Sequence, residues 1–245
     1  MLLTERLCEN HPKDSFTIFR IVKLYRSVVT LHPVTREVNS QAHKTPLRRE
    51  QAALTRARII EGATAVFEAR GYEGARIEDI ASEARVAVPT VYKVFANKRN
   101  LLKASVEAAM RGGEAGEVER QAWFREQLEE PTAEGQLRLI ARNARRMYDR
   151  AGQLLEVVRA AAASDTDIEA LWRGINDERL GRARTSASSL ASKAKLRTTV
   201  GEAARTLWVL SVPELYVFQI HTGGLNPDDY ERWLGDLLVA ALLGD

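Results

Sequence analysis

The sequence contains few of the residues from which catalytic and metal sites are most often built. It has one cysteine, Cys8, and four histidines, three of them within the first 45 residues, so that His221 is alone in the rest of the chain. A single cysteine cannot form an intramolecular disulfide, and a Cys–His nucleophilic pair or a histidine-rich metal site has almost no residues to form it. Phosphate-binding glycine loops and nucleophile elbows are also absent. We therefore expect no enzymatic activity, no metal and no cofactor.

Long apolar runs are missing as well. The longest candidate, Thr206 to Ile220, is interrupted by Pro213 and Glu214, whereas a transmembrane helix needs about 18 or more apolar residues in succession. No basic segment followed by an apolar core and a cleavage site marks a signal peptide. A hydrophobic content of 45% and a charged content of 28% are typical of globular proteins. We expect a cytoplasmic protein without a membrane partner.

Positive charge is unevenly distributed along the chain. Residues 46–110 carry 11 Lys and Arg against 8 Asp and Glu, whereas residues 111–245 carry 18 against 21. An excess of positive charge is typical of DNA-binding domains, although an excess this small is also common in domains that bind no nucleic acid.

The most informative stretch runs from residue 77 to residue 102. Helical spacing of Ile77, Ile80 and Ala81 predicts a short amphipathic helix over 77–84. After a break at 85–87, Pro89 is placed in a first helical turn, where its missing N–H has no intrahelical partner. Two short helices joined by such a turn form a helix-turn-helix unit, whose second helix lies in the major groove of DNA.

In the second of these helices, Val91 and Phe95 share one face and Pro89 and Lys93 the other. The outer face is expected to reach base edges and phosphates, and Lys98 is expected to contact the backbone of the duplex from the start of the next helix, which Asn97 caps. The predicted DNA-binding residues are Arg76, Val88, Pro89, Thr90, Tyr92, Lys93 and Lys98.

Residues 86–92, which read VAVPTVY, together with Phe95, Lys98 and Leu101-Leu102, resemble the DNA-binding signature of TetR-type transcriptional regulators. The resemblance covers roughly residues 48–106. This chain departs from the family pattern at three positions: Arg85 stands where glycine is usual, and Arg76 and Ala87 stand where a capping Ser or Thr is common. Each lost cap weakens its helix by roughly 0.5–2 kcal/mol, and Arg85 implies either left-handed strain or a turn that avoids positive φ.

The fold predicted for the whole chain is all-α, with an N-terminal three-helix, homeodomain-like helix-turn-helix domain and a larger helical ligand-binding and dimerisation domain. Residues 1–45 are expected to be a poorly ordered arm or sequence upstream of the start codon that the cell uses, with a basic amphipathic helix as the alternative. Residues 46–111 form the DNA-binding domain, with a first helix over 47–70 that Gly71 ends. Residues 114–245 form the regulatory domain.

The regulatory domain reads as helices separated by short breaks. The pattern predicts helices over 117–127, from Thr132 to a break at Gly152, over 154–163, and from Asp165 to about residue 191. Two further helices are predicted, one kinked at Pro213 and one that begins at Asn226-Pro227.

The resemblance implies a homodimer that binds a palindromic operator, with the last two helices pairing in a four-helix bundle. It also implies a small-molecule pocket between the middle helices. The candidate pocket residues are Trp123, Met147, Tyr148, Trp172, Trp208 and Tyr216, and the candidate dimer residues are Tyr230, Leu234, Leu237, Leu238 and Ala241. For both sets, the alternative is that the side chains only fill the core of their own chain.

The function that these expectations favour is a ligand-responsive transcriptional regulator, in particular a repressor. The alternative is a helical protein that binds a protein partner and has lost specific DNA recognition. The two differ in what they predict for Tyr92 and Lys93, which only the regulator needs.

Overall fold

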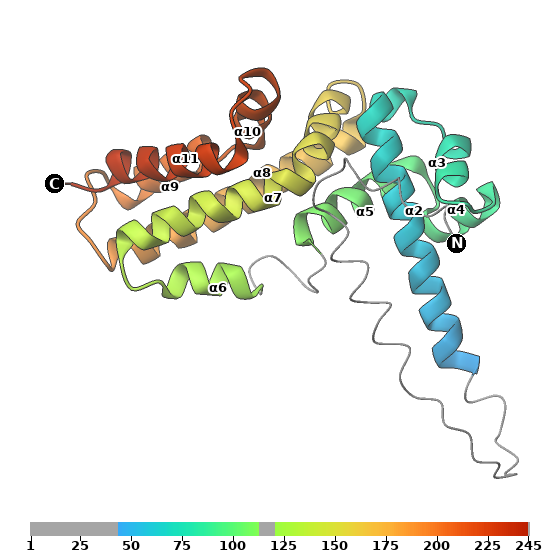
Figure 1. Cartoon of the computed structure of the whole chain (residues 1–245), viewed down its shortest axis with the longest axis horizontal. Coiled ribbons are helices and arrows are strands. Elements are labelled where there is room, and N and C mark those ends of the chain that lie inside the picture. The colour runs from blue at the N-terminus through green and yellow to red at the C-terminus, as the bar shows by residue number, and fades with distance from the viewer. Residues whose placement is uncertain (1–43, 113–120, 245) are drawn as a thin grey trace, which may run out of the picture. The chain divides into compact units, whose positions relative to one another are not determined.

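The computed structural model describes residues 44–112 and 121–244, and within them the fold is all-α, as predicted (Figure 1). The chain divides into two compact units, Met1–Pro46 and Leu47–Asp245. The predicted arm lies outside the described residues, so the second unit is the one described here. Its helices are α2 (Lys44–Gly74), α3 (Ile77–Glu83), α4 (Val88–Phe95), α5 (Lys98–Arg111), α6 (Ala122–Glu129), α7 (Ala133–Ala161), α8 (Thr166–Ala191), α9 (Val200–Leu210), α10 (Pro213–Val217), the π-helix η2 (Phe218–Thr222) and α11 (Pro227–Leu242).

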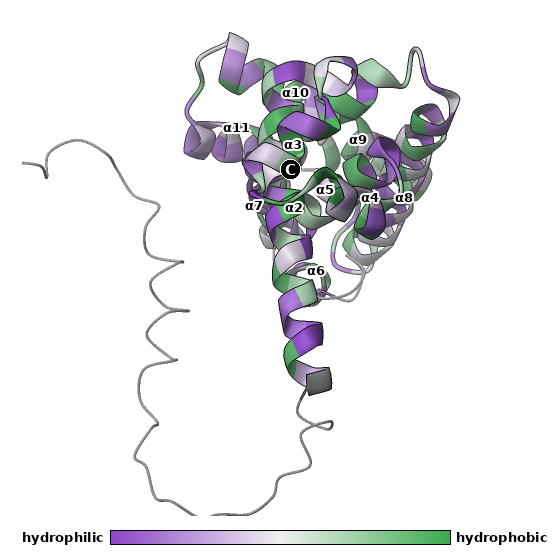
Figure 2. Cartoon of the chain, turned by 90° about the vertical axis from the view of Figure 1, so that its right-hand side faces the viewer, coloured by the Kyte–Doolittle hydropathy of each residue, from purple (hydrophilic) through white to green (hydrophobic). Residues whose placement is uncertain are grey.

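Helix α2 ends its regular part where the sequence predicts. Gly71 has φ 68° and ψ 179°, a left-handed conformation that glycine adopts without steric cost, and the helical turns on either side of it are separated by this kink. The N-terminal turns of α2 are mainly hydrophilic (Figure 2), and residues 46–54 are all exposed. Ile59, Ala63 and Phe67 then bring the helix into the core.

Helices α3 and α4 and the turn between them, here called the reading head, follow the predicted boundaries. Ile80 and Val91 are at most 1% exposed and pack in one core with Ile59, Phe67 and Leu101. Helix α5 begins at the predicted cap, because Asn97 Oδ1 accepts a hydrogen bond from the Asn100 amide at 2.8 Å. It ends at Gly112, which has the left-handed φ of 62° that closes many helices.

The helices from α6 to α11, residues 121–244, form what we call the helical body. Helix α11 packs along α7, and α9 packs along α8. Four of these helices start at side-chain caps: Thr132, Asp165 and Asn226, where the sequence predicts helix starts, and also Thr199 each accept a backbone N–H of the following turn. In addition, Glu202 bonds back to the Thr199 amide, which completes a capping box.

Two boundary predictions in the helical body are wrong. Gly152 does not interrupt a helix, because α7 continues through it; a Cβ there would lie 3.1 Å from Val217 Cγ2, so this glycine permits close packing of α7 and α10. Pro213 does not kink one long helix either. Helix α9 ends at Leu210, and Pro213 opens α10 in the first-turn position that proline tolerates.

One predicted helix can be compared with the structure only in part. The helix predicted over 117–127 corresponds to α6, which begins at Ala122. Residues 117–120 of the prediction lie outside the described part of the chain. None of the described helices is long and apolar enough to cross a membrane.

Candidate nucleic-acid interface and ligand pocket

The outer face of α4 is built as the helical spacing predicts. Val91 and Phe95 are 1% and 5% exposed and anchor the helix in the core, whereas Tyr92 is 48% exposed. Pro89 and Lys93 are exposed, and Val88 and Thr90 are partly exposed. The anchored face fixes the orientation of the exposed one, as a surface that reads a rigid duplex requires.

The turn before α4 has the left-handed strain that Arg85, in place of the family's usual glycine, suggests. Arg85 has φ 53°, in the left-handed region that costs non-glycine residues energy. The turn is closed by backbone hydrogen bonds from the Arg85 amide to Ser82 and from the Val86 amide to Ala81. Arg76 and Ala87 provide no side-chain cap, as expected.

Helix α2 contacts α3 near both of its ends. Arg70 of α2 pairs with Asp79 of α3 at 2.5 Å. Gly62 of α2 lies against the end of α3, where a Cβ would come within 2.9 Å of the Ala84 amide nitrogen. The sequence gives no signal of this close approach, because a glycine inside a helical pattern looks the same whether or not another backbone touches it. Arg76 itself is exposed and lies 3.7 Å from Glu78.

Lys98 has a different position from the one that the sequence suggests. Its Nζ donates hydrogen bonds to the Tyr72 and Ala75 carbonyl oxygens at 2.8 and 3.1 Å and lies 4.4 Å from the centre of the Tyr72 ring. These carbonyls belong to the end of α2 beyond the Gly71 kink and to the loop before α3, where helical partners are lost. Lys98 thus stabilises the base of the reading head, and a phosphate contact by this side chain stays a prediction.

The reading head is connected to the helical body through α5. Arg99 of α5 lies 3.4 Å from Asp165, the cap of α8, and also pairs with Asp167. At the other end of α5, Arg150 of α7 donates to the Ala109 carbonyl oxygen at 3.2 Å. A shift of α7 or α8 would therefore move α5, which directly follows the reading head.

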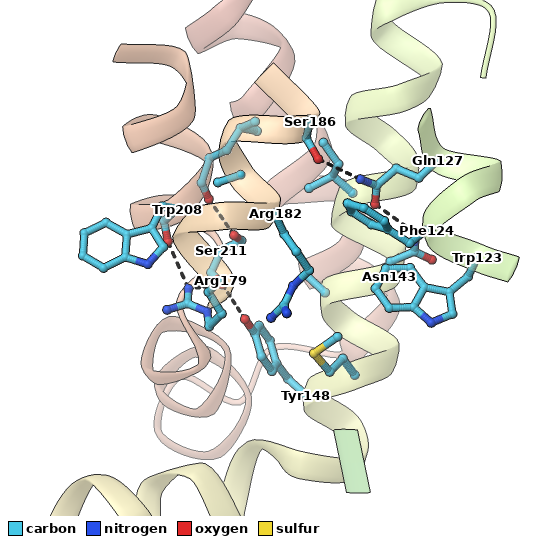
Figure 3. Close-up of a pocket in the computed structure, with 15 residues that line it drawn as sticks. Trp123, Phe124, Gln127, Asn143, Tyr148, Arg179, Arg182, Ser186, Trp208 and Ser211 are labelled. Carbon is cyan, nitrogen blue, oxygen red and sulfur yellow. Dashed lines mark hydrogen bonds between the residues drawn. The ribbon is translucent and has the colours of Figure 1, made fainter. Parts of the chain in front are cut away.

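The helical body holds a pocket between α6, α7, α8 and α9, with a cavity of about 80 Å³ (Figure 3). Four of the six predicted pocket residues line it: Trp123, Met147, Tyr148 and Trp208. Trp172 and Tyr216 are not among the lining residues. Tyr216 instead donates a hydrogen bond to Asp149, and burial, followed by that contact, raises its pKa above the ordinary value. Tyr216 is therefore part of the core, which was the alternative.

Polar side chains in the pocket form two hydrogen-bonded groups. Gln127 of α6 donates to Ser186 Oγ of α8 at 3.1 Å and accepts from Asn143 of α7 at 3.1 Å. The Tyr148 hydroxyl donates to the Ser211 carbonyl oxygen at 2.6 Å, and Arg179 donates to the same oxygen at 2.9 Å. The first group joins α6, α7 and α8, and the second joins α7 and α8 to Ser211, the residue that follows α9.

Sequence reasoning missed these polar residues. Arg179 and Ser186 lie on the same stripe of α8 as the buried Ile175 and Leu190, so a charged residue at a core position was the available signal.

The predicted dimer residues are divided between the core and the surface. Tyr230, Leu234 and Leu238 are fully buried within the chain, because this stripe of α11 packs on α7. Leu237 and Ala241 are partly exposed and are the members that a second copy can contact. Burial raises the pKa of the Tyr230 hydroxyl.

Comparison with known sequences identifies the first part of the chain. Residues 59–105 match the sequence model of the bacterial regulatory proteins of the tetR family. A segment of 56 residues is 43% identical to the HTH-type transcriptional repressor SCO4008 of Streptomyces coelicolor. That match covers 23% of this chain and spans about 29% of the length of the relative.

Comparison with solved structures extends over most of the chain. The transcriptional regulator FadR of Bacillus subtilis, solved with stearoyl-CoA, is 19% identical, with a TM-score of 0.61 over 76% of this chain and 98% of that one. A candidate transcriptional regulator of Saccharomonospora viridis, solved with choline, is 20% identical, with a TM-score of 0.60 over 78% of this chain and 98% of that one. At these identities the likeness shows the fold alone.

Proposed function

We propose, because this chain belongs to the TetR family of bacterial regulatory proteins, that it is a ligand-responsive repressor that binds a palindromic operator as a homodimer. The observation that carries the proposal is the construction of α4, whose apolar face is locked in the core while Pro89, Tyr92 and Lys93 are exposed. A protein with this role acts on DNA in the cytoplasm.

The exposed residues have different roles in the proposal. Lys93 and Pro89 contact base edges in the major groove, where lysine can donate to guanine. Thr90 and Tyr92 hold phosphates, which position the helix but carry no sequence information. Arg76 adds a phosphate contact from the start of α3, and Val88 lies against the sugar-phosphate backbone.

The proposed dimer places two reading heads on one face of the duplex. A two-fold dimer reads half-sites about 34–36 Å apart, one helical turn of DNA, or a multiple of this. Leu237 and Ala241 of α11 are the proposed contact residues, together with the neighbouring Trp233, which is 36% exposed.

A ligand acts in this proposal by favouring one spacing of the reading heads over another. It must bind more tightly to the form whose heads are misplaced for the operator. Helix α8 lines the pocket with Arg179, Arg182 and Ser186 and contacts α5 through its cap, Asp165. It therefore connects the pocket to α5, the helix that directly follows the reading head.

Selection of random duplex DNA by the purified full-length protein tests the proposal. An enriched palindrome, with affinity that falls as salt rises, is the expected result. Weak binding that depends steeply on salt without an enriched sequence would refute the proposal. That outcome is the one predicted by the alternative, a helical partner-binding protein that no longer recognises a DNA sequence.

A further inference from the structure

The first turns of α2 form a basic and exposed stretch of helix. Residues 47–58 read LRREQAALTRAR, with four arginines against one glutamate, and residues 46–54 are all exposed. Figures 1 and 2 show these turns continuing beyond the other described helices. The sequence model of the family matches from residue 59 onward, so this stretch lies outside the matched segment.

Two of the arginines lie on the side of α2 that enters the core further along the helix. Arg48 precedes Ile59 by 11 residues and Arg49 precedes Phe67 by 18, which are about three and five turns of an α-helix. Both Ile59 and Phe67 are fully buried. The side of α2 that is apolar within the core is therefore basic beyond it. Arg58, directly before Ile59, lies about 100° around the helix from that side.

The basic side of α2 continues from a contact with α4. The Arg56 guanidinium carbon lies 4.5 Å from the centre of the Phe95 ring, and a cation is attracted to the face of an aromatic ring. Phe95 is on the core side of α4, opposite the exposed Lys93, so in the proposed complex α4 lies between this part of α2 and the DNA. Arg48 and Arg49 are about 10–12 Å further along the helix axis, where α2 is exposed and α4 no longer covers it.

The charge of these two arginines is not balanced by the helix itself. The positions three and four residues before and after each of them hold Lys, Thr, Pro, Gln or Ala, none of them a carboxylate, and only such positions face each other on a helix. In the part of the chain that the structure describes, no ion pair or hydrogen bond engages the side chain of Arg48 or Arg49. A guanidinium group stays protonated at any ordinary pH, so this side of α2 presents two fixed positive charges.

We propose that Arg48 and Arg49 bind phosphates of the duplex beside the groove that α4 occupies, so that α2 extends the DNA-binding surface beyond the reading head. The planar guanidinium matches two phosphate oxygens, and such charge-assisted hydrogen bonds are strong. Contacts to phosphates carry no sequence information, so they strengthen binding to every sequence alike. This inference rests on the proposed function, because it adds a second contact with the same partner.

The salt dependence of DNA binding tests the inference. The full-length wild type, Arg48→Gln and Arg49→Gln are titrated with the selected duplex and with a random-sequence duplex at several salt concentrations. Glutamine has nearly the helix propensity of arginine but no charge. For each variant, the slope of log affinity against log salt should become shallower by about 0.9 on both duplexes, with the preferred sequence unchanged. An unchanged slope in both variants, or a changed sequence preference, overturns the inference.

The matched control is Arg58→Gln, which removes the same charge from the other side of the same helix, where the arginine is also exposed. Its slope should change much less. An equal change in Arg58→Gln would show an effect of net charge alone and overturn the assignment to Arg48 and Arg49. Circular dichroism checks that each variant is folded. Should either glutamine variant not fold, the corresponding lysine variant, which keeps the charge, must retain the wild-type slope.

Failure of this inference can be told apart from failure of the proposed function. If the wild type selects no DNA sequence, the proposed function is refuted, and the random-sequence duplex still measures whether Arg48 and Arg49 contact phosphates. If a palindrome is selected but the two variants keep the wild-type slope, the regulator reads its operator without α2, and only the inference is refuted.

Discussion

Replacement of Gly62 by alanine tests the packing that holds the reading head on α2. In an ordinary helix interior this change stabilises a protein by about 0.5–1 kcal/mol, because glycine loses more backbone entropy on folding than alanine does. At Gly62, however, the new Cβ would lie 2.9 Å from the Ala84 amide nitrogen and 3.3 Å from its Cα and Cβ. These atoms belong to the end of α3 and its turn, so the neighbour cannot move without moving the reading head.

The size of the expected destabilisation is measured against a control glycine that has no close neighbours. Gly181 lies in the interior of α8, and a Cβ there would meet nothing within 4 Å, so Gly181→Ala should show the full gain in helix propensity. Overpacking against a well-packed neighbour costs about 1–3 kcal/mol. We therefore expect Gly62→Ala to be less stable than Gly181→Ala by about that amount, which corresponds to roughly 2–4 °C in Tm for each kcal/mol.

Urea unfolding followed by circular dichroism measures the two free energies of unfolding, and DNA affinity measures the position of the reading head. Gly62→Ala should weaken DNA binding as well, whereas Gly181→Ala should not. If both variants are stabilised equally, α3 does not approach α2 as closely as described, and the proposed close packing of Gly62 against Ala84 is wrong.

Four further predictions concern charged side chains. Lys93→Ala should reduce discrimination at one or two base pairs by about 1–3 kcal/mol, measured with single-base variants of the selected site. Lys98→Ala should lower the free energy of unfolding by about 1–3 kcal/mol, because two backbone carbonyls lose their donor, and leave the preferred sequence unchanged. Arg99→Gln should keep DNA binding but reduce the effect of an effector on it, measured as the ratio of DNA affinities with and without the ligand. Hydrogen bonds from the Thr199 amide, then from its hydroxyl, lower the pKa of Glu202 below its ordinary 4.5, so this contribution to stability is present above about pH 4.5 and is lost as the pH falls through the lowered pKa.

Each of these predictions has a control variant, a direct test or a result that would contradict it. Lys103→Ala removes an exposed lysine of α5 paired with Glu107 at 3.9 Å and should change stability by less than about 0.5 kcal/mol. Arg173→Gln removes an exposed pair on α8 and should leave the effector response intact. Glu202→Gln should make the acid limb of the stability profile shallower. Lys93→Ala with unchanged sequence preference would remove Lys93 from the base contacts.

The reading head was largely predictable because local rules determine it. Helical spacing identified Val91 and Phe95 as buried and Lys93 as exposed, and Asn97, as a capping residue, indicated the start of α5. These properties depend on helical periodicity and on one capping bond, which nearby residues decide.

Features that depend on distant parts of the chain were not predictable in the same way. Gly152 looks like a helix break in sequence, and only the approach of α10 explains why the helix continues through it without a side chain there. The ammonium group of Lys98 points to carbonyls 23 and 26 residues earlier. In the pocket, four aromatic or sulfur-containing residues were identified, but the arginines were missed because periodicity does not distinguish a buried charge from an exposed one.

The unequal capping of the helices has a consequence for heat tolerance. Helices α3, α4, α6 and α10 start without side-chain caps, whereas α7, α8, α9 and α11 each start with one. Local unfolding begins where the free energy of opening is smallest. On warming, the four uncapped helices are therefore expected to open before the four capped ones, so the reading head, α6 and α10 should lose hydrogen-exchange protection first.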